Sequence, residues 1–101
     1  MNSGESMADR RIIWSLESST QIQHIKENIL VNWSEKEVNL FLGRLRKFEK
    51  IVFKYPYLYP RSLKYPNTRK AVISKHNSVI YQIEDDVIRI LTILINRQEN
   101  E

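Results

Sequence analysis

Few side chains in this 101-residue sequence could transfer a proton or form a covalent intermediate. The chain has no cysteine, which excludes a thiolate nucleophile and a cysteine metal site. Its two histidines, His24 and His76, are too few to hold a metal ion without carboxylates, so we expect no metal and no other cofactor. His76, Tyr81 and Lys75 are the candidates for proton transfer, because imidazole titrates near neutral pH.

Each candidate also has a structural interpretation. His76 falls in a predicted turn, where an exposed histidine commonly takes no part in catalysis. Tyr81 lies on a predicted strand with apolar neighbours two positions away on either side, which favours packing in the core over a catalytic hydroxyl. Arg97 follows the last predicted strand and could hold a phosphate, pair with an acid on a target, or pair with Glu99.

Positive charge is concentrated in the middle of the chain. Residues 44–75 contain ten Lys and Arg residues against the single acid Glu49, a net charge of 10 − 1 = +9, so the remainder sums to 4 − 9 = −5. Charge that served only solubility would be interspersed. This asymmetry indicates a polyanion or an acidic protein surface as partner, and a solvated basic face without a partner is the alternative.

Two helices are expected in the first half of the chain. Residues 11–15 are β-branched and aromatic and predict a strand. Ile22, Ile25, Ile29 and Trp33 then recur at helical spacing, with Ser18 or Ser19 available as the cap.

The second helix is predicted from a capping box. Ser34 and Glu37 form this box, and the helix should end near Tyr55, before Pro56. We expect the two helices to form a hairpin whose apolar stripes face one core, with four internal residues: Ile25, Trp33, Phe41 and Phe48.

The second half of the chain predicts three strands, at residues 69–74, 78–84 and 87–95, with turns at 75–77 and 84–86. Strands joined by short turns run antiparallel. The predicted fold class is therefore α+β, in the order β-α-α-β-β-β, with the helical hairpin packed on one face of a small antiparallel sheet. The other face should be at least partly open. Residues 1–10 are expected to be a disordered arm before a single domain at residues 11–99.

The segment "YPYLYPRSLKYP", residues 55–66, is a proline-braced loop rich in tyrosine. Its rings could stack on nucleic-acid bases while Arg61 and Lys64 hold phosphates. Packing of the tyrosines over the end of the second helix is the interpretation that we favour.

Three segments together resemble the RelE/ParE superfamily of bacterial type II toxin-antitoxin toxins: "NWSEKEVNLFLGRLRKFEKIVFKYPYLYPRS", "RKAVISKHNSVIYQIEDDVIRILTIL" and the terminal "NRQEN". The resemblance covers about residues 11 to 99. It implies a compact toxin neutralised by a co-expressed antitoxin whose helix and strand wrap the helical hairpin and the sheet. It also implies one of two targets. ParE-like members poison DNA gyrase, and RelE-like members enter the ribosome and cut messenger RNA.

The resemblance favours the ParE-like branch. RelE-like nucleases typically carry an arginine early in the second strand of the hairpin, in an R-L-V-Y pattern, and this sequence has Ser78 in place of that arginine. Several of these nucleases end the last strand with a catalytic His or Tyr, whereas here Asn96, Arg97 and Gln98 follow Ile95. Amide side chains cannot exchange a proton near neutral pH. "NRQEN" also resembles the ending of ParE-like members.

The resemblance and the charge pattern together predict a cytoplasmic toxin that binds its target. The predicted partners are an antitoxin and DNA gyrase, with the ribosome and messenger RNA as the alternative and no membrane. A non-toxic binding module on the same fold is a further alternative. The predicted target-binding residues form a basic rim around the open sheet: Arg61, Arg69, Lys70, Lys75 and Arg97.

Overall fold

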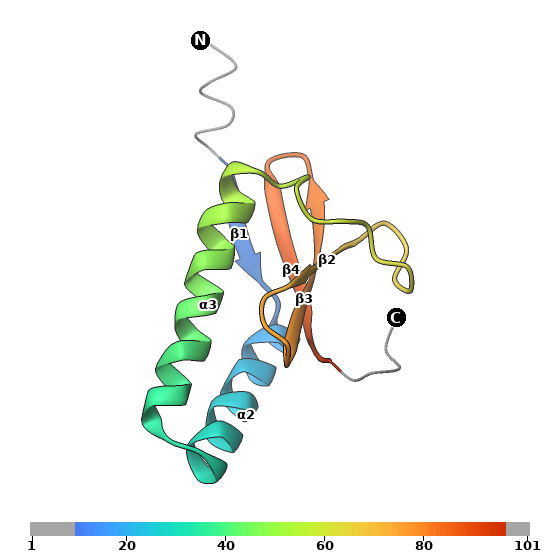
Figure 1. Cartoon of the computed structure of the whole chain (residues 1–101). Helices are drawn as coiled ribbons and strands as arrows, with labels where there is room; N and C mark the ends of the chain where they lie inside the picture. The colour runs from blue at the N-terminus through green and yellow to red at the C-terminus, as the bar shows by residue number, and fades with distance from the viewer. Residues whose placement is uncertain (1–9, 97–101) are drawn as a thin grey trace.

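The computed structural model describes residues 10–96, so residues 1–9 of the predicted arm, and Arg97, lie outside the described residues. The order of elements is the predicted one, β-α-α-β-β-β. Two helices pack against one face of a four-stranded sheet, and the end of the helical hairpin extends beyond the end of the sheet (Figure 1). The elements are β1 (Arg11–Trp14), α2 (Leu16–Asn32), α3 (Glu35–Lys54), β2 (Arg69–Val72), β3 (Asn77–Glu84) and β4 (Val87–Ile95).

The sheet has the strand order β1-β4-β3-β2 and is mixed. The predicted antiparallel pairing is confirmed for β2 with β3 and for β3 with β4, whereas β1 runs parallel to β4. The direction of β1 differs from the expectation because no short turn joins it to β4: two helices and two strands lie between them in the chain. Asp85 lies in the tight turn between β3 and β4 and adopts a left-handed conformation, φ 52°, which Asp tolerates.

The two helices are capped by serines. The predicted cap of α3 is confirmed, since the Ser34 hydroxyl accepts a hydrogen bond from the Glu37 amide at 3.3 Å. The predicted cap of α2 is wrong, because Ser15 caps that helix and accepts from the Ser18 amide at 3.0 Å. Ser15 also donates to the Leu91 carbonyl at 2.8 Å, and this contact fixes the start of the helix against β4. Within residues 10–96, neither helix is long and apolar enough to cross a bilayer.

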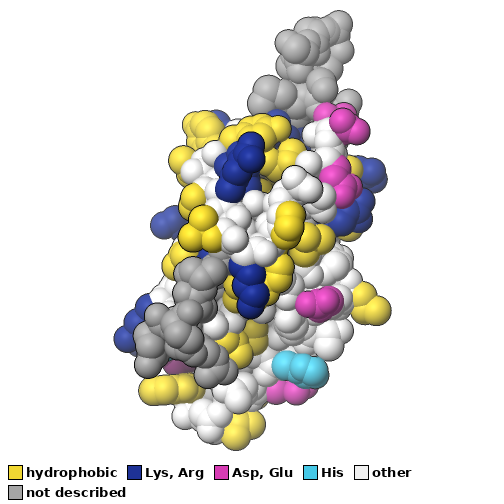
Figure 2. All heavy atoms as spheres, turned by 90° about the vertical axis from the view of Figure 1, so that its right-hand side faces the viewer, with side chains coloured by type: hydrophobic (Ala, Val, Ile, Leu, Met, Phe, Trp, Pro, Cys, Tyr) yellow, Lys and Arg dark blue, Asp and Glu magenta, His cyan; other side chains and the backbone are white. Residues whose placement is uncertain are grey.

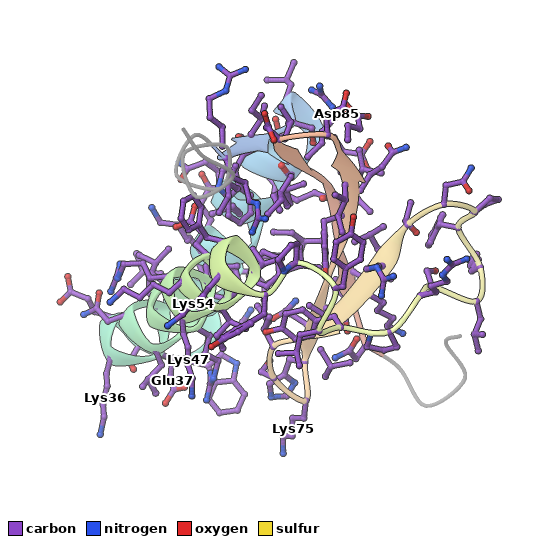
Figure 3. The ribbon with its side chains drawn as sticks, turned by 90° about the horizontal axis from the view of Figure 1, so that it is seen from above. Lys36, Glu37, Lys47, Lys54, Lys75 and Asp85 are labelled. Atoms are coloured by element: carbon purple, nitrogen blue, oxygen red, sulfur yellow. The ribbon has the colours of Figure 1, made fainter. Side chains whose placement is uncertain are left out.

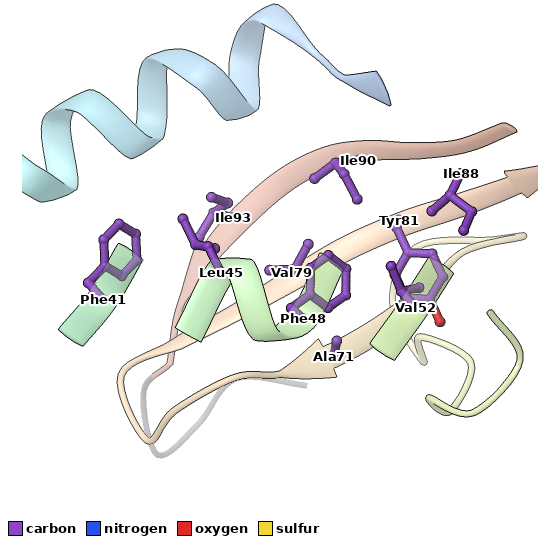
Figure 4. Close-up of a cluster of buried hydrophobic side chains, with 10 residues drawn as sticks. All are labelled: Phe41, Leu45, Phe48, Val52, Ala71, Val79, Tyr81, Ile88, Ile90 and Ile93. Carbon is purple, nitrogen blue, oxygen red and sulfur yellow. The ribbon is translucent and has the colours of Figure 1, made fainter. Parts of the chain in front are cut away.

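The core lies between α3 and the sheet (Figure 4). Phe41 and Phe48 are buried as predicted, and Ile25 packs against the buried cluster. The predicted burial of Trp33 is wrong, since this residue is 75% exposed. It lies at the tip of the hairpin, beyond the end of the sheet, where no strand covers it. The buried apolar cluster consists of Phe41, Leu45, Phe48, Val52, Ala71, Val79, Tyr81, Ile88, Ile90 and Ile93.

One edge of β4 is covered by a helix side chain. Strand β1 pairs with β4 only as far as Ile90, so the following β4 amides have no strand beside them. The Gln21 side-chain oxygen of α2 accepts from the Ile93 amide at 2.7 Å and from the Thr92 hydroxyl at 3.0 Å. Because a buried amide without a partner is costly, this contact allows β1 to be short.

Candidate functional site

Three of the predicted target-binding cations lie close together along the outer strand. Arg61 forms an antiparallel bridge with Arg69, and the Lys70 amide donates to the Pro60 carbonyl at 3.0 Å. Lys75 lies on the turn after β2, is exposed, and points the same way as Lys36 (Figure 3). We call Arg61, Arg69, Lys70 and Lys75 the basic β2 edge. The fifth predicted residue, Arg97, is outside the described residues.

Arg69 differs from the other cations because its guanidinium is used inside the molecule. It donates to the Tyr59 carbonyl at 2.7 Å and to the Tyr57 carbonyl at 3.4 Å. It also lies 5.1 Å from the centre of the Tyr57 ring, within the range of a cation–π contact. Arg69 therefore holds the loop after α3 in place, while Arg61 and Lys75 remain exposed.

The Tyr81 hydroxyl is committed to the core. The residue is fully buried, and its hydroxyl donates to the Pro56 carbonyl at 2.6 Å. Burial raises the pKa of Tyr81 well above that of an exposed tyrosine, and the nearby Arg69 charge offsets this only in part. The ring packs edge-on against Phe48 and Tyr59, with ring centres 5.8 and 6.2 Å away. In this arrangement Tyr81 braces the loop and has no open path to a substrate.

Ser78, at the position where the nuclease pattern has arginine, is fully buried. Its hydroxyl donates to the Asn96 side-chain oxygen at 2.7 Å. The Asn96 amide group in turn donates to the Ser74 carbonyl at 3.0 Å, and its backbone amide donates to the His76 carbonyl at 2.8 Å. Ser78 and Asn96 thus fix the β2–β3 turn against the end of β4, which is a structural use of both residues.

A groove of about 490 Å³ lies where the helical hairpin extends past the sheet. It runs between α2 and α3 on one side and the β2–β3 turn with the end of β4 on the other. Phe41 is buried in it, whereas Trp33 and Ile95 are largely exposed. Its apolar lining comes from Ile25, Ile29, Trp33, Phe41 and Ile95.

The same groove brings together both histidines of the chain. His24 comes from α2 and His76 from the β2–β3 turn, and Arg44 and Glu37 come from α3. His76 is exposed, as its position in a turn predicts. Two imidazoles and a guanidinium in one groove can bind an anion or exchange protons with a ligand. Among the described residues, no group of His, Cys, Asp and Glu side chains is placed to hold a metal ion.

Several solved structures share this arrangement, and one of them is of a toxin-antitoxin system. ParE of the chromosomal ParDE system from P. aeruginosa matches with a TM-score of 0.76 at 13% identity, over 87% of this chain and 97% of that chain. The chain has the RelE/ParE toxin fold. YafQ from E. coli strain BL21(DE3) matches with a TM-score of 0.63, and the E. coli DinJ-YafQ complex with 0.57, each at 13% identity. These cover 87% and 86% of this chain and 94% and 93% of theirs.

At 13% identity the shared RelE/ParE fold leaves the target of this chain open. No family model and no curated protein sequence matches the chain. The function of the chain therefore depends on the side chains that this particular sequence places on the fold.

Sequence reasoning missed two features of the surface. It missed the groove, since the spacing of His24, Ile25, Asn28 and Ile29 indicates one helix face but not that this face extends past the sheet. It also missed how basic and apolar groups mix. Figure 2 shows Lys and Arg side chains separated by hydrophobic ones on the face at the right of Figure 1. The run of cations at residues 44–75 does not indicate this mixing, because neighbours in sequence need not be neighbours on the surface.

Proposed function

We propose that this protein is the toxin of a type II toxin-antitoxin system, that it acts in the cytoplasm by binding DNA gyrase, and that a cognate antitoxin neutralises it. The fold shared with ParE supports the class of protein. The burial of Ser78 is the observation that favours binding over cleavage of RNA as the mechanism. A buried serine bonded to Asn96 replaces the cation that ribosome-dependent cleavage would need against the phosphate charge.

The basic β2 edge is the proposed contact with gyrase or its bound DNA. Within residues 51–83 the sequence has no Asp or Glu, so charge in this region is uniformly positive. Such a surface accelerates association with an acidic partner, and salt weakens the effect. An inhibitor of this kind needs no proton-transferring residue, because trapping a protein–DNA intermediate requires only binding.

A supercoiling and cleavage-complex assay with purified gyrase tests the proposal. Micromolar protein should inhibit supercoiling and stabilise cleaved DNA, and no inhibition at that concentration would rule out this target. Replacing Arg61, Lys70 and Lys75 with Gln should slow association about 10-fold at low salt. The matched control removes the same charge elsewhere, by Gln at Lys26, Lys36 and Lys50. An equal loss in both variants would show that net charge, and not the β2 edge, matters.

The groove is the proposed docking site for the antitoxin. Its apolar lining includes Ile29 and Trp33, and Arg44 lies in it with Lys75 on the adjoining turn. An amphipathic antitoxin segment with acidic residues fits this combination. Trp33→Ala should weaken antitoxin binding and leave gyrase inhibition unchanged, as measured by calorimetry and the supercoiling assay. Unchanged antitoxin affinity would place the antitoxin elsewhere.

Ribosome-dependent RNA cleavage is the second candidate, because the groove joins His24, His76 and Arg44. These groups could supply the acid, the base and the cation of a metal-independent cleavage. Primer extension on translated messages would reveal new ends in the ribosomal A site. His24→Ala and His76→Ala should then abolish those ends, and Arg97→Ala tests the terminal arginine. Growth that is unaffected by expression of the chain alone would instead indicate a non-toxic binding module.

A further inference from the structure

The loop after α3 alternates between anchored and exposed residues. Pro56 is buried and its carbonyl accepts the Tyr81 hydroxyl, and Tyr59 is half-buried against Phe48, with ring centres 5.8 Å apart. Tyr57 and Leu58, between these anchors, are 66% and 63% exposed. Alternation in so short a segment means that the inward residues fix where the outward ones lie.

The exposed residues are held by further contacts. The Leu58 amide donates to the Tyr55 carbonyl at 3.1 Å, which closes a turn. The Arg69 guanidinium bonds to the carbonyls of Tyr57 and Tyr59 and stacks on the Tyr57 ring. Because the loop is already ordered, binding through it costs less conformational entropy than binding through a mobile segment.

The exposed side chains are of the kind that dominates protein interfaces. Tyr and Arg are enriched among the residues whose truncation costs most binding energy, and a rigid Tyr adds contact area at low entropic cost. Lys54 lies 5.6 Å from the centre of the Tyr55 ring, so cations flank the apolar groups on both sides. With no acid in residues 51–83, a pocket bordered by carboxylates is the complementary surface.

We propose that Tyr55, Tyr57 and Leu58 form a rigid apolar knob that inserts into an apolar, acid-bordered pocket on the protein that this toxin poisons. This inference rests on the proposed function in so far as it assumes a protein target. It assigns two roles to neighbouring surfaces. The basic β2 edge speeds the encounter, and the knob holds the complex together once it has formed.

Leu58→Ala tests the knob, with Leu30→Ala as the matched control. Leu30, in the last turn of α2, is 56% exposed, a fraction similar to the 63% of Leu58. The tip of the helical hairpin, where α2 ends, lies at the opposite end of the molecule from the loop after α3 (Figure 1). Both variants should unfold at the wild-type temperature because each removes an exposed side chain. Leu58→Ala should weaken gyrase binding about 10-fold or more, through faster dissociation. Leu30→Ala should bind like the wild type. If Leu58→Ala also bound like the wild type, the proposal that the knob inserts into the target would be refuted.

Arg69→Lys is the second test, since it keeps the charge and removes the planar group that bonds to two carbonyls. It should raise the dissociation rate of the complex without changing the salt dependence of association. If only the positive charge of Arg69 were needed, Arg69→Lys would bind like the wild type. That result would refute the proposal that Arg69 holds the loop rigid for binding.

The two proposals fail in different ways. If the wild-type chain does not bind gyrase but arrests growth, the gyrase proposal falls, and growth becomes the measurement for the knob. Leu58→Ala should then relieve the arrest and Leu30→Ala should not. Arrest by both variants would refute the knob alone, and a wild-type chain that causes no arrest would refute both proposals.

Discussion

Replacing Tyr81 with phenylalanine should lower the free energy of unfolding by about 2 kcal/mol at pH 7. The substitution keeps the ring contacts and removes the 2.6 Å hydrogen bond to the Pro56 carbonyl. A typical hydrogen bond contributes about 1 kcal/mol, and a buried acceptor left without a partner costs about 1–3 kcal/mol. For a domain of this size, about 2 kcal/mol corresponds to a melting temperature roughly 10 °C lower.

The pH dependence of the same variant gives an independent check. Burial raises the pKa of Tyr81 in the folded protein, so the folded state keeps its proton at a pH where the unfolded chain has lost it. The stability due to this group is fully present below about pH 10, the pKa of an unperturbed tyrosine. Above that pH the wild type should lose up to about 1.4 kcal/mol per pH unit from this group. Tyr81→Phe has no hydroxyl at this position and lacks that loss. The free energies of unfolding of the wild type and the variant should therefore converge as the pH rises above 10.

Urea unfolding followed by circular dichroism, at pH 7 and at intervals above pH 10, measures both effects. Tyr57→Phe is the control, because the Tyr57 side chain is largely exposed and its variant should match the wild type throughout. Equal stability of Tyr81→Phe and the wild type at pH 7 would refute the buried hydrogen bond. If the free energy of unfolding of the wild type exceeded that of Tyr81→Phe by the same amount at every pH above 10, the proposed protonation of Tyr81 in the folded state would be refuted.

Three further substitutions test the packing and the caps. Phe48→Ala should cost about 3–5 kcal/mol in urea unfolding because it empties the centre of the buried cluster. Trp33→Ala should change stability by no more than about 0.5 kcal/mol, since the ring is exposed, and a large loss would mean that it packs in solution. Ser34→Ala should cost about 1 kcal/mol. Ser15→Ala should cost more, because Ser15 also bonds to Leu91, and equal melting temperatures of the two cap variants would contradict this.

The local pattern of the sequence was sufficient to predict most of the elements. The capping box at Ser34 located the start of α3, and the β-branched runs located the last three strands. Both signals depend on neighbours in sequence. The direction of β1 does not, because β1 pairs with β4, which follows it only after two helices and two further strands.

The site was less predictable for the same physical reason. Trp33 lies on the apolar stripe of its helix, yet the hairpin extends past the sheet and leaves it exposed. Nothing in the sequence distinguishes Arg69 from the other cations of residues 44–75. Only the folded loop brings the carbonyls of Tyr57 and Tyr59 to its guanidinium. The length of an element relative to its neighbours, and contacts across many residues, are not encoded in local periodicity.

The single glutamine side chain that covers the β4 edge has a consequence for how the isolated protein behaves. Unpaired strand edges recruit strands from other molecules, and β4 is rich in isoleucine and leucine. Gln21 takes the place of a missing neighbour strand at Ile93. With alanine there, the isolated chain should self-associate by edge pairing, whereas the wild type keeps that edge closed through one amide oxygen.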